Sequence, residues 1–262
     1  MPKVLMCPPD YYDISYHINP WMARSSFINK DLAYQQWVGL KNQIQDFLGL
    51  PVETITPQPN LPDMVFTRDQ GIIQDRTFIP ANFTPPQRRG ETDHYCRWFE
   101  KNDYTINQIS SRCKFEGGDF LEWDGLLFGG CGFRTDRESH IKLARITGFN
   151  LISLELINPL FFHLDMALFP LGNGVLAYYP SAFSLSSRRI LENLSAQIVH
   201  ISHSDACDFS LNTLFYKSKI LANHCTKYLS DMLDELGYKV TKVDVSEFTK
   251  AGGGIHCLTL MV

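Results

Sequence analysis

The chain has 262 residues, of which 44% are hydrophobic, 13% aromatic and 20% charged. This composition is typical of a globular protein and excludes a disordered, collagen-like or coiled-coil chain. The formal net charge is −4, and no basic run is longer than the two residues of Arg88-Arg89, so we do not expect nucleic acid as a partner. No stretch approaches the ~18 uninterrupted apolar residues of a membrane span.

The cysteines and the first residues indicate the cellular compartment. Seven cysteines are widely spaced and form no Cys-x-x-Cys pair, which disfavours both a disulfide framework and a zinc ribbon. The apolar run at residues 4–7 is too short for a signal peptide. We therefore predict a cytoplasmic protein in a reducing environment.

The sequence repeats one plan at intervals of 45 to 50 residues. Four segments, which begin at residues 63, 116, 163 and 208, contain a polar cluster, an apolar run, a short turn and a second apolar run. The turns at 74–76, 123–125, 172–174 and 217–219 predict β-hairpins. Equivalent positions are separated by 50, 46, 47 and 45 residues, and these are Asp69, Asp119, Asp165, Asn212 and Cys257.

A helical pattern and a further β-like run follow each hairpin. The helices are expected at 30–47, 92–101, 139–147, 187–194 and 225–236. The later strands are expected at 52–55, 104–109, 151–156, 198–201 and 239–245. The pattern predicts a unit of strand, strand, helix and strand repeated five times, with 8–29 and 80–91 as loops. The last run, 256–262, lacks a second strand, and pairing with 4–7 would close a ring without open sheet edges.

The polar residues at the start of each first strand are expected to converge in such a ring. They are Asp63, Arg68, Asp69, Glu116, Asp119, His163, Asp165, Asp208, Asn212, His256 and Cys257. Buried acids need partners, so the cluster implies a bound cation. A guanidinium is planar, offers several N–H donors and fits paired carboxylates best. The thiol and imidazole suit a nucleophile and an acid/base.

Four ordered motifs carry a family resemblance. They are Phe-Thr-Arg-Asp at 66–69, Phe-Glu-Gly-Gly-Asp at 115–119, Phe-His-Leu-Asp at 162–165 and Gly-Gly-Gly-Ile-His-Cys at 252–257. The chain resembles the guanidino-group-modifying penteins, which include arginine deiminase, dimethylarginine dimethylaminohydrolase, amidinotransferase and arginine dihydrolase. The resemblance implies an α/β fold, a five-bladed α/β propeller of five ββαβ repeats with pseudo-five-fold symmetry. Residues 1–262 would form a single catalytic domain.

The resemblance also implies a role for each matching residue. Cys257 matches the nucleophile and His163 the general acid/base. Six residues match substrate-binding groups: Glu116, Asp165, Asp69, Asp63, Asn19 and Arg134. Glu116 is also counted as catalytic, and Arg134 matches the group that binds the substrate α-carboxylate. The roles of Arg68, Arg88, Arg89 and Asp119 stay open.

The implied activity is hydrolysis of a guanidino C–N bond of arginine or an N-methylated arginine, through a thiouronium on Cys257. Arginine dihydrolase activity is an alternative, which the motifs at 7–10 and 19–22 favour, although that group carries Asn where this chain has Asp69. An amidinotransferase is a further alternative. A translation initiation factor of the same fold only binds, but that group lacks the Cys/His pair, so a binding role is remote.

The expected partner is a small guanidino compound. No cofactor is implied, because Gly252–Gly254 precedes a strand and not the helix that a phosphate-binding loop requires. No metal site is expected either. The sequence leaves the oligomeric state open and allows a homo-oligomer.

Overall fold

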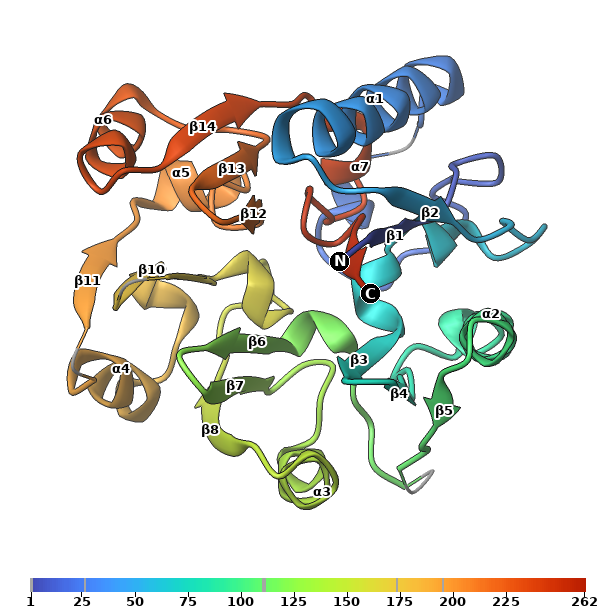
Figure 1. Ribbon diagram of the computed structural model, residues 1–262, viewed down its shortest axis with the longest axis horizontal. Helices are drawn as coiled ribbons and strands as arrows, with labels where there is room; N and C mark the ends of the chain where they lie inside the picture. Colours follow the sequence, from blue (N-terminus) through green and yellow to red (C-terminus); the bar gives the residue numbers. More distant parts are fainter. Residues whose placement is uncertain (1, 26, 110–111, 173, 195) are drawn as a thin grey trace. The chain divides into compact units, whose positions relative to one another are not determined.

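The computed structural model describes residues 2–25, 27–109, 112–172, 174–194 and 196–262 (Figure 1). The chain divides into two compact units. The first consists of Met1–Thr67 and Ser202–Val262, and the second of Arg68–Ile201.

Both ends of the chain form one sheet in the first unit. Its order is β15 (Leu260–Met261), β1 (Val4–Met6) and β2 (Val52–Thr54). β1 runs antiparallel to β15, with Val4 opposite Met261, and parallel to β2. Figure 1 accordingly shows both termini beside β1. The predicted pairing of 4–7 with the last apolar run is therefore confirmed.

The helix of this repeat connects β1 to β2. It is α1 (Lys30–Gln43), which continues as one π-helical turn, η2 (Ile44–Leu48). Asn29 caps its N-terminus by accepting a hydrogen bond from the backbone N–H of Leu32, and Gly49 ends it in a left-handed conformation at φ 74°. The buried side chains of Trp37 and Leu40 pack into the unit's core.

The second repeat of this unit has the same plan. Its sheet has the order β12 (Leu214–Tyr216), β13 (Lys219–Ala222) and β14 (Lys239–Lys242), with α6 (Lys227–Glu235) between β13 and β14. Three short helical segments that the sequence did not predict lie in the connections between the strands and helices of the repeats. They are η1 (Met22–Arg24), α5 (His203–Cys207) and α7 (Ser246–Thr249).

The second unit contains three repeats. The first has β3 (Gly71–Gln74), β4 (Thr77–Pro80), α2 (Thr92–Lys101) and β5 (Thr105–Ile106). The next has β6 (Phe120–Trp123), β7 (Leu126–Cys131), α3 (Arg137–Thr147) and β8 (Asn150–Glu155). The last has β9 (Leu168–Leu171), β10 (Val175–Tyr178), η8 (Pro180–Ala182), α4 (Leu185–Glu192) and β11 (Gln197–His200).

Every repeat pairs its first two strands antiparallel and its third strand parallel to the second. The two sheets of the first unit follow the same rule, so the predicted ββαβ unit is confirmed in five sheets. Asp124 and Gly125 show why the hairpins form, because both have positive φ, at 46° and 81°, as the twist-matched two-residue turn requires. The predicted turn residue Asn173 lies outside the described residues.

The polar motifs occupy turns, and their predicted placement on the first strands is wrong. Four short 3₁₀ turns precede those strands: η3 (Pro62–Val65), η4 (Thr67–Gln70), η6 (Gly117–Asp119) and η7 (Leu164–Met166). A 3₁₀ turn aims successive side chains in different directions, whereas a strand sends alternate ones to opposite faces. The turn therefore lets several polar groups of one motif reach a common point. The predicted loop 80–91 also contains such a turn, η5 (Pro86–Arg88).

Aromatic side chains anchor these turns in the second unit. Phe115 and Phe120 flank η6, are fully buried, and lie edge to face with ring centroids 6.0 Å apart. Ile72 of β3 and Ile79 of β4 belong to the same buried cluster. In close packing of this kind, even a change of one methylene group in side-chain volume is felt, so the turns are held firmly in place.

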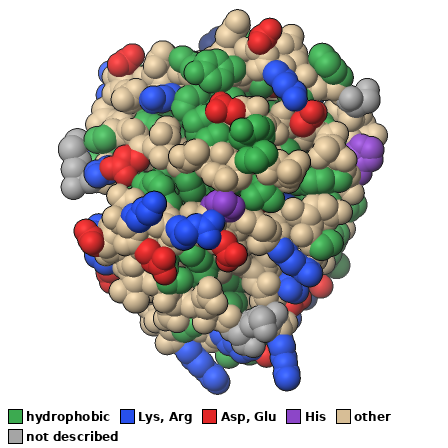
Figure 2. All heavy atoms as spheres, turned by 90° about the vertical axis from the view of Figure 1, so that its right-hand side faces the viewer, with side chains coloured by type: hydrophobic (Ala, Val, Ile, Leu, Met, Phe, Trp, Pro, Cys, Tyr) green, Lys and Arg blue, Asp and Glu red, His purple; other side chains and the backbone are tan. Residues whose placement is uncertain are grey.

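In the part of the chain that the structure describes, none of the helices has the length and apolar character needed to cross a bilayer. On the face drawn in Figure 2, Lys and Arg side chains are interspersed with Asp and Glu. A surface of mixed charge produces only a weak field for steering a polyanion.

Candidate active site

His163 is the centre of a buried charged cluster in the second unit. It directly precedes η7 and is 1% exposed. Its Nε2 lies 2.9 Å from Oε2 of Glu116, and its Nδ1 lies 3.4 Å from Oδ1 of Asp69. Both imidazole nitrogens therefore face a carboxylate.

This surrounding favours the protonated imidazole. Burial by itself lowers the pKa of His163, but the charge of Asp69 and the hydrogen bond to Glu116 outweigh it and raise the pKa to about 9. Burial raises the pKa of Glu116, but Arg134 and His163 outweigh that effect and lower the pKa to about 2. At neutral pH the pair is an imidazolium next to a carboxylate.

Two arginines extend the cluster. Arg134 Nη1 lies 3.0 Å from Oε2 of Glu116, and Arg88 Nη1 lies 2.6 Å from Oδ2 of Asp69. The charges thus alternate along Arg134, Glu116, His163, Asp69 and Arg88. Alternation gives each buried charge an opposite neighbour, which buried ions require.

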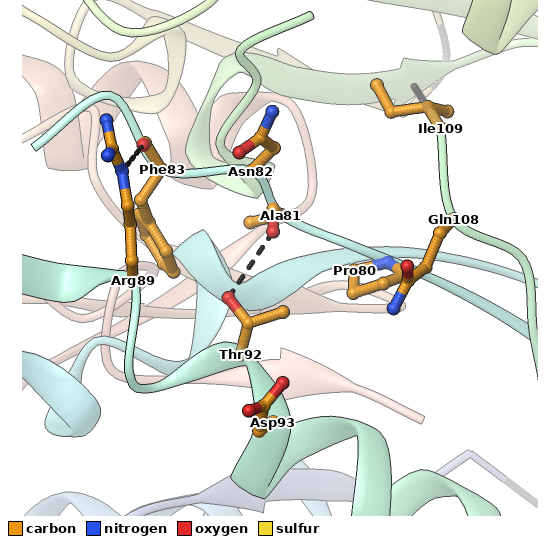
Figure 3. Close-up of a pocket in the computed structure, with 9 residues that line it drawn as sticks. All are labelled: Pro80, Ala81, Asn82, Phe83, Arg89, Thr92, Asp93, Gln108 and Ile109. Carbon is orange, nitrogen blue, oxygen red and sulfur yellow. Dashed lines mark hydrogen bonds between the residues drawn. The ribbon is translucent and has the colours of Figure 1, made fainter. Parts of the chain in front are cut away.

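The structure separates the two adjacent arginines whose roles the sequence left open. Arg88 is 3% exposed and belongs to the cluster. Arg89 instead donates from Nε to the carbonyl oxygen of Phe83, at 3.2 Å. It lines a pocket of about 270 Å³ with Pro80, Ala81, Asn82, Phe83, Thr92, Asp93, Gln108 and Ile109 (Figure 3). None of the five residues of the alternating cluster lines this pocket.

Glycines explain the close approach of the turns. A Cβ on Gly118 would lie 2.7 Å from Oδ1 of Asp69 and 2.9 Å from Nδ1 of His163. A Cβ on Gly117 would lie 2.2 Å from the carbonyl oxygen of Arg68. The Glu-Gly-Gly-Asp motif therefore lets the backbone of η6 pass directly against η4 and the imidazole.

The remaining motif residues of this unit lie in or beside the same turns. Asp119 accepts a hydrogen bond from the backbone N–H of Leu164, at 3.0 Å, and burial raises its pKa to about 7. It thereby fixes the turn that carries His163. Asp165 lies in η7 and is 1% exposed. Arg68 donates to the carbonyl oxygen of Phe120, which joins η4 to the start of β6.

Cys257 belongs to the first unit and is 2% exposed. The Asn212 side chain makes two contacts with it. Nδ2 donates to Sγ at 3.2 Å, and Oδ1 accepts from the Cys257 N–H at 3.2 Å. Asn212 is among the polar residues predicted to converge, but no motif assigned it a role. Its position in the repeat, equivalent to Asp165, was the available signal.

The glycines before Cys257 also fit tightly. A Cβ on Gly253 would lie 2.2 Å from the Phe66 ring, and a Cβ on Gly254 would lie 2.6 Å from Oδ1 of Asn212. Gly252 has a φ of 86°. The three glycines therefore let the chain turn sharply and bring the thiol against the Asn212 amide.

Two other predicted residues lie in this unit. Asp63 is 1% exposed, and its Oδ2 accepts a hydrogen bond from the Tyr16 hydroxyl at 2.9 Å. Asn19 donates to the carbonyl oxygen of Ala251 at 2.9 Å and accepts from the N–H groups of Trp21 and Met22. Asn19 therefore ties its loop to the segment that leads to Cys257, while its part in substrate binding stays a prediction.

Three groups of the cluster are near enough to hold a metal ion. The ligand atoms of Asp69, Glu116 and His163 lie within 4.8 Å of one another. A metal-bound imidazole must be neutral, whereas these carboxylates raise the pKa of His163. Arg88 and Arg134 also pair with the same two carboxylates. The donor set therefore suits a proton on His163 better than a metal ion.

Five ββαβ sheets, a histidine between carboxylates and a cysteine after a glycine-rich turn are the features of a pentein. Residues 14–262 match the family model described as N,N dimethylarginine dimethylhydrolase, eukaryotic. The chain belongs to this family, and its predicted place among the penteins is confirmed.

Two kinds of relative resemble the chain over almost its whole length. The N(G),N(G)-dimethylarginine dimethylaminohydrolase of Mycobacterium tuberculosis is 34% identical over 99% of this chain and 85% of its own. The bifunctional arginine dihydrolase/ornithine cyclodeaminase AgrE of Nostoc is 38% identical over 99% of this chain. The chain spans only 38% of the length of AgrE and 37% of that of ArgZ, the corresponding protein of Synechocystis.

Solved structures agree with this placement. The N-terminal domain of ArgZ bound to substrate, an arginine dihydrolase, superposes with a TM-score of 0.96 at 35% identity, covering 100% of this chain and 98% of that one. The dimethylarginine dimethylaminohydrolase of Pseudomonas aeruginosa shares the fold, with a TM-score of 0.83 at 20% identity, covering 99% of this chain and 98% of that one.

The packing of Gly253 yields a first prediction. Gly253→Ala forces a methyl group into the Phe66 ring, and we expect a loss of about 1–3 kcal/mol in the free energy of unfolding. Urea denaturation measures it. Gly39→Ala in α1 is the matched control, since nothing lies within 4 Å of its added Cβ, and it should stabilise by up to about 1 kcal/mol. Equal stability of the two variants would contradict the packing argument.

The titration of His163 yields a second prediction. In a carbon-13 NMR titration of labelled histidine, the His163 signal should change with a midpoint near pH 9, the value of its raised pKa. Glu116→Gln should lower that midpoint. Because the folded pKa lies above the ordinary 6.5, the stability that His163 contributes is complete below pH 6.5 and is lost as the pH rises through 9. A midpoint below 7 would refute the assignment.

Proposed function

We propose that this protein hydrolyses a guanidino C–N bond of arginine or an N-methylated arginine, and that residues 1–262 act as one catalytic domain. The supporting observation is the buried His163 imidazole held between Glu116 and Asp69, whose charges raise its pKa. Membership in the dimethylarginine dimethylhydrolase family supports the substrate class. The proposal includes the five-bladed propeller, its ring closed through β1 and β15.

Cys257 is the proposed nucleophile. The thiolate sulfur attacks the guanidinium carbon and forms a C–S bond, which gives a tetrahedral adduct. The Asn212 amide donates to this sulfur, and a hydrogen bond to the charged form favours the thiolate over the thiol. A bound guanidinium next to the sulfur favours it further.

His163 is the proposed proton donor and acceptor. It gives its proton to the departing ammonia or amine as the C–N bond breaks, and a thiouronium remains on Cys257. The neutral imidazole then takes a proton from water as the water oxygen attacks the same carbon. Collapse of this adduct breaks the C–S bond, releases the ureido product and regenerates the thiolate. Because the pKa of His163 is raised to about 9, the free enzyme starts in the acid form that the first step needs.

The carboxylates are the proposed guanidinium ligands. Asp69, Glu116 and Asp165 would orient the substrate cation, which makes attack effectively unimolecular. Asp63 and Asn19 are proposed as further substrate contacts. Arg134 is proposed to bind the α-carboxylate. Since Arg134 pairs with Glu116 in this structure, it must then serve both carboxylates at once.

Arginine dihydrolase activity is a second candidate, favoured by the similarity to AgrE and to the ArgZ domain. It would release ornithine, carbon dioxide and two ammonia. The resemblance to that group breaks at Asp69, where the group carries Asn. A reducing, cytoplasmic setting is proposed as well, since the seven cysteines are widely spaced and include no Cys-x-x-Cys pair.

The products distinguish these activities. Purified protein incubated with arginine, with asymmetric dimethylarginine, or with arginine and glycine is analysed by mass spectrometry, and we expect citrulline from one of the first two. Ornithine with two ammonia would instead establish the dihydrolase, and ornithine with guanidinoacetate the transferase.

Cys257→Ser and His163→Ala should each lower kcat by about 10³-fold or more. Cys207→Ser is the control, and near-native activity of Cys257→Ser would refute the nucleophile.

Asp69→Asn tests what stops the reaction after one hydrolysis. The substitution removes a negative charge beside His163 and replaces one oxygen with an N–H₂ donor. If the carboxylate limits the reaction to a single step, the variant should release ornithine from arginine where the parent protein releases citrulline. Amino-acid analysis of the products measures the ratio. An active variant with an unchanged product would show that Asp69 does not set the outcome.

A further inference from the structure

Glu91 is a buried acid that the mechanism leaves unused. It is 0% exposed and occupies the N-cap position of α2. Ser, Thr, Asp and Asn are preferred there because their side chains accept a hydrogen bond from the first turn, but the Glu91 side chain makes no such bond. A buried glutamate normally requires a charged partner. Helix capping therefore does not explain why a glutamate is buried at this position, whereas a charged partner does.

That partner is Arg88 of the charged cluster. Arg88 Nε lies 3.1 Å from Oε1 and 3.3 Å from Oε2 of Glu91, and Nη2 lies 2.9 Å from Oε2. Gln70, the neighbour of Asp69 in η4, donates from Nε2 to the same Oε2. Glu91 thus holds one edge of the guanidinium, and Nη1 is directed to Asp69 at 2.6 Å.

The charges show what this arrangement achieves. If Arg88 paired with Asp69 alone, its positive charge would offset the negative charge of Asp69 and weaken the effect of that charge on His163. Glu91 supplies a second negative charge, so that Arg88 and Glu91 balance each other and Asp69 retains its charge for His163. Buried ion pairs are often less stabilising than apolar residues of similar volume, so stability alone does not account for these three ions.

We propose that Glu91 is a positioning residue of the active site, which holds Arg88 in place and balances its charge so that Asp69 acts on His163 and on the substrate guanidinium. This inference rests on the proposed function. It adds the N-cap residue of α2 to a site that is otherwise built mainly from the turns before the strands.

The surroundings of His163 give the direction of the effect. Asp69 faces it from η4, and Glu116 and Asp119 face it from the start and end of the η6 motif. Asp165 lies in the turn that follows it, Arg88 pairs with Asp69, and Arg134 pairs with Glu116. Without the Glu91 charge, Arg88 is no longer balanced. The imidazolium then becomes less favourable, and the pKa of His163 falls.

Glu91→Gln tests the proposal in the full-length protein. We expect the NMR midpoint of His163 to fall by about one pH unit, and the alkaline limb of the kcat/KM profile to fall with it. In an Arg88→Gln background the same substitution should leave the midpoint unchanged, because Glu91 acts through Arg88. Glu100→Gln, an exposed acid of the same helix, is the control and should titrate like the parent.

Two outcomes overturn the proposal: a Glu91→Gln midpoint equal to the parent's, or an equal decrease in the Arg88→Gln background. Glu91→Asp keeps the charge and should leave the midpoint near the parent value, so it decides the matter if Glu91→Gln does not fold. A midpoint lowered by a full unit in Glu91→Asp would refute the charge argument. The titration needs no substrate. A protein that turns over no guanidino compound would therefore refute the proposed function while the titration still tests Glu91.

Discussion

A protonated imidazole buried between two carboxylates is the interaction on which the second unit depends. Glu116 and Asp69 face the two nitrogens of His163, and a buried ion group of this kind is tolerated only when every charge has a partner. Three separate turns must therefore meet within a few ångströms. This need accounts for Gly118, whose backbone lies directly against both Asp69 and His163, and for the two arginines that balance the acids.

In the first unit, the pairing of the chain ends has a comparable effect on the thiol. β15 follows Cys257 by only three residues and is fixed to β1 by its register. The glycines before Cys257 let the chain approach Phe66 and Asn212. Cys257 is thus held on both sides, by the strand after it and the turn before it. Such preorganisation matters for the proposed role of Cys257, because a nucleophile that is misplaced by about 1 Å can lose 10²-fold in rate.

Local patterns predicted the repeats, and long-range contacts determined most of what was missed. Alternating apolar runs with Asp-Gly and similar turns fix hairpins over a few residues, so the five ββαβ units could be found from the sequence. Arg88 and Arg89 are indistinguishable in sequence, and only the fold buries the first against Asp69. Glu91 carries no motif at all. The 3₁₀ turns were missed because a short polar segment before a strand gives no periodic signal.

Asp69 links the charge of Arg88 to the protonation of His163, and through it to the proposed reaction outcome. One of its oxygens faces Arg88 and the other faces His163, so it is an acceptor on both sides. An amide here keeps one acceptor but turns an N–H₂ group toward one of two cations. If residue 69 carried an amide, Glu91 alone would balance the charge of Arg88, and the pKa of His163 would be lower. A larger fraction of the imidazole would then be neutral and available as the base in the proposed attack by a second water. A carboxylate favours the acid form, which suits a reaction that ends after one C–N bond is cleaved.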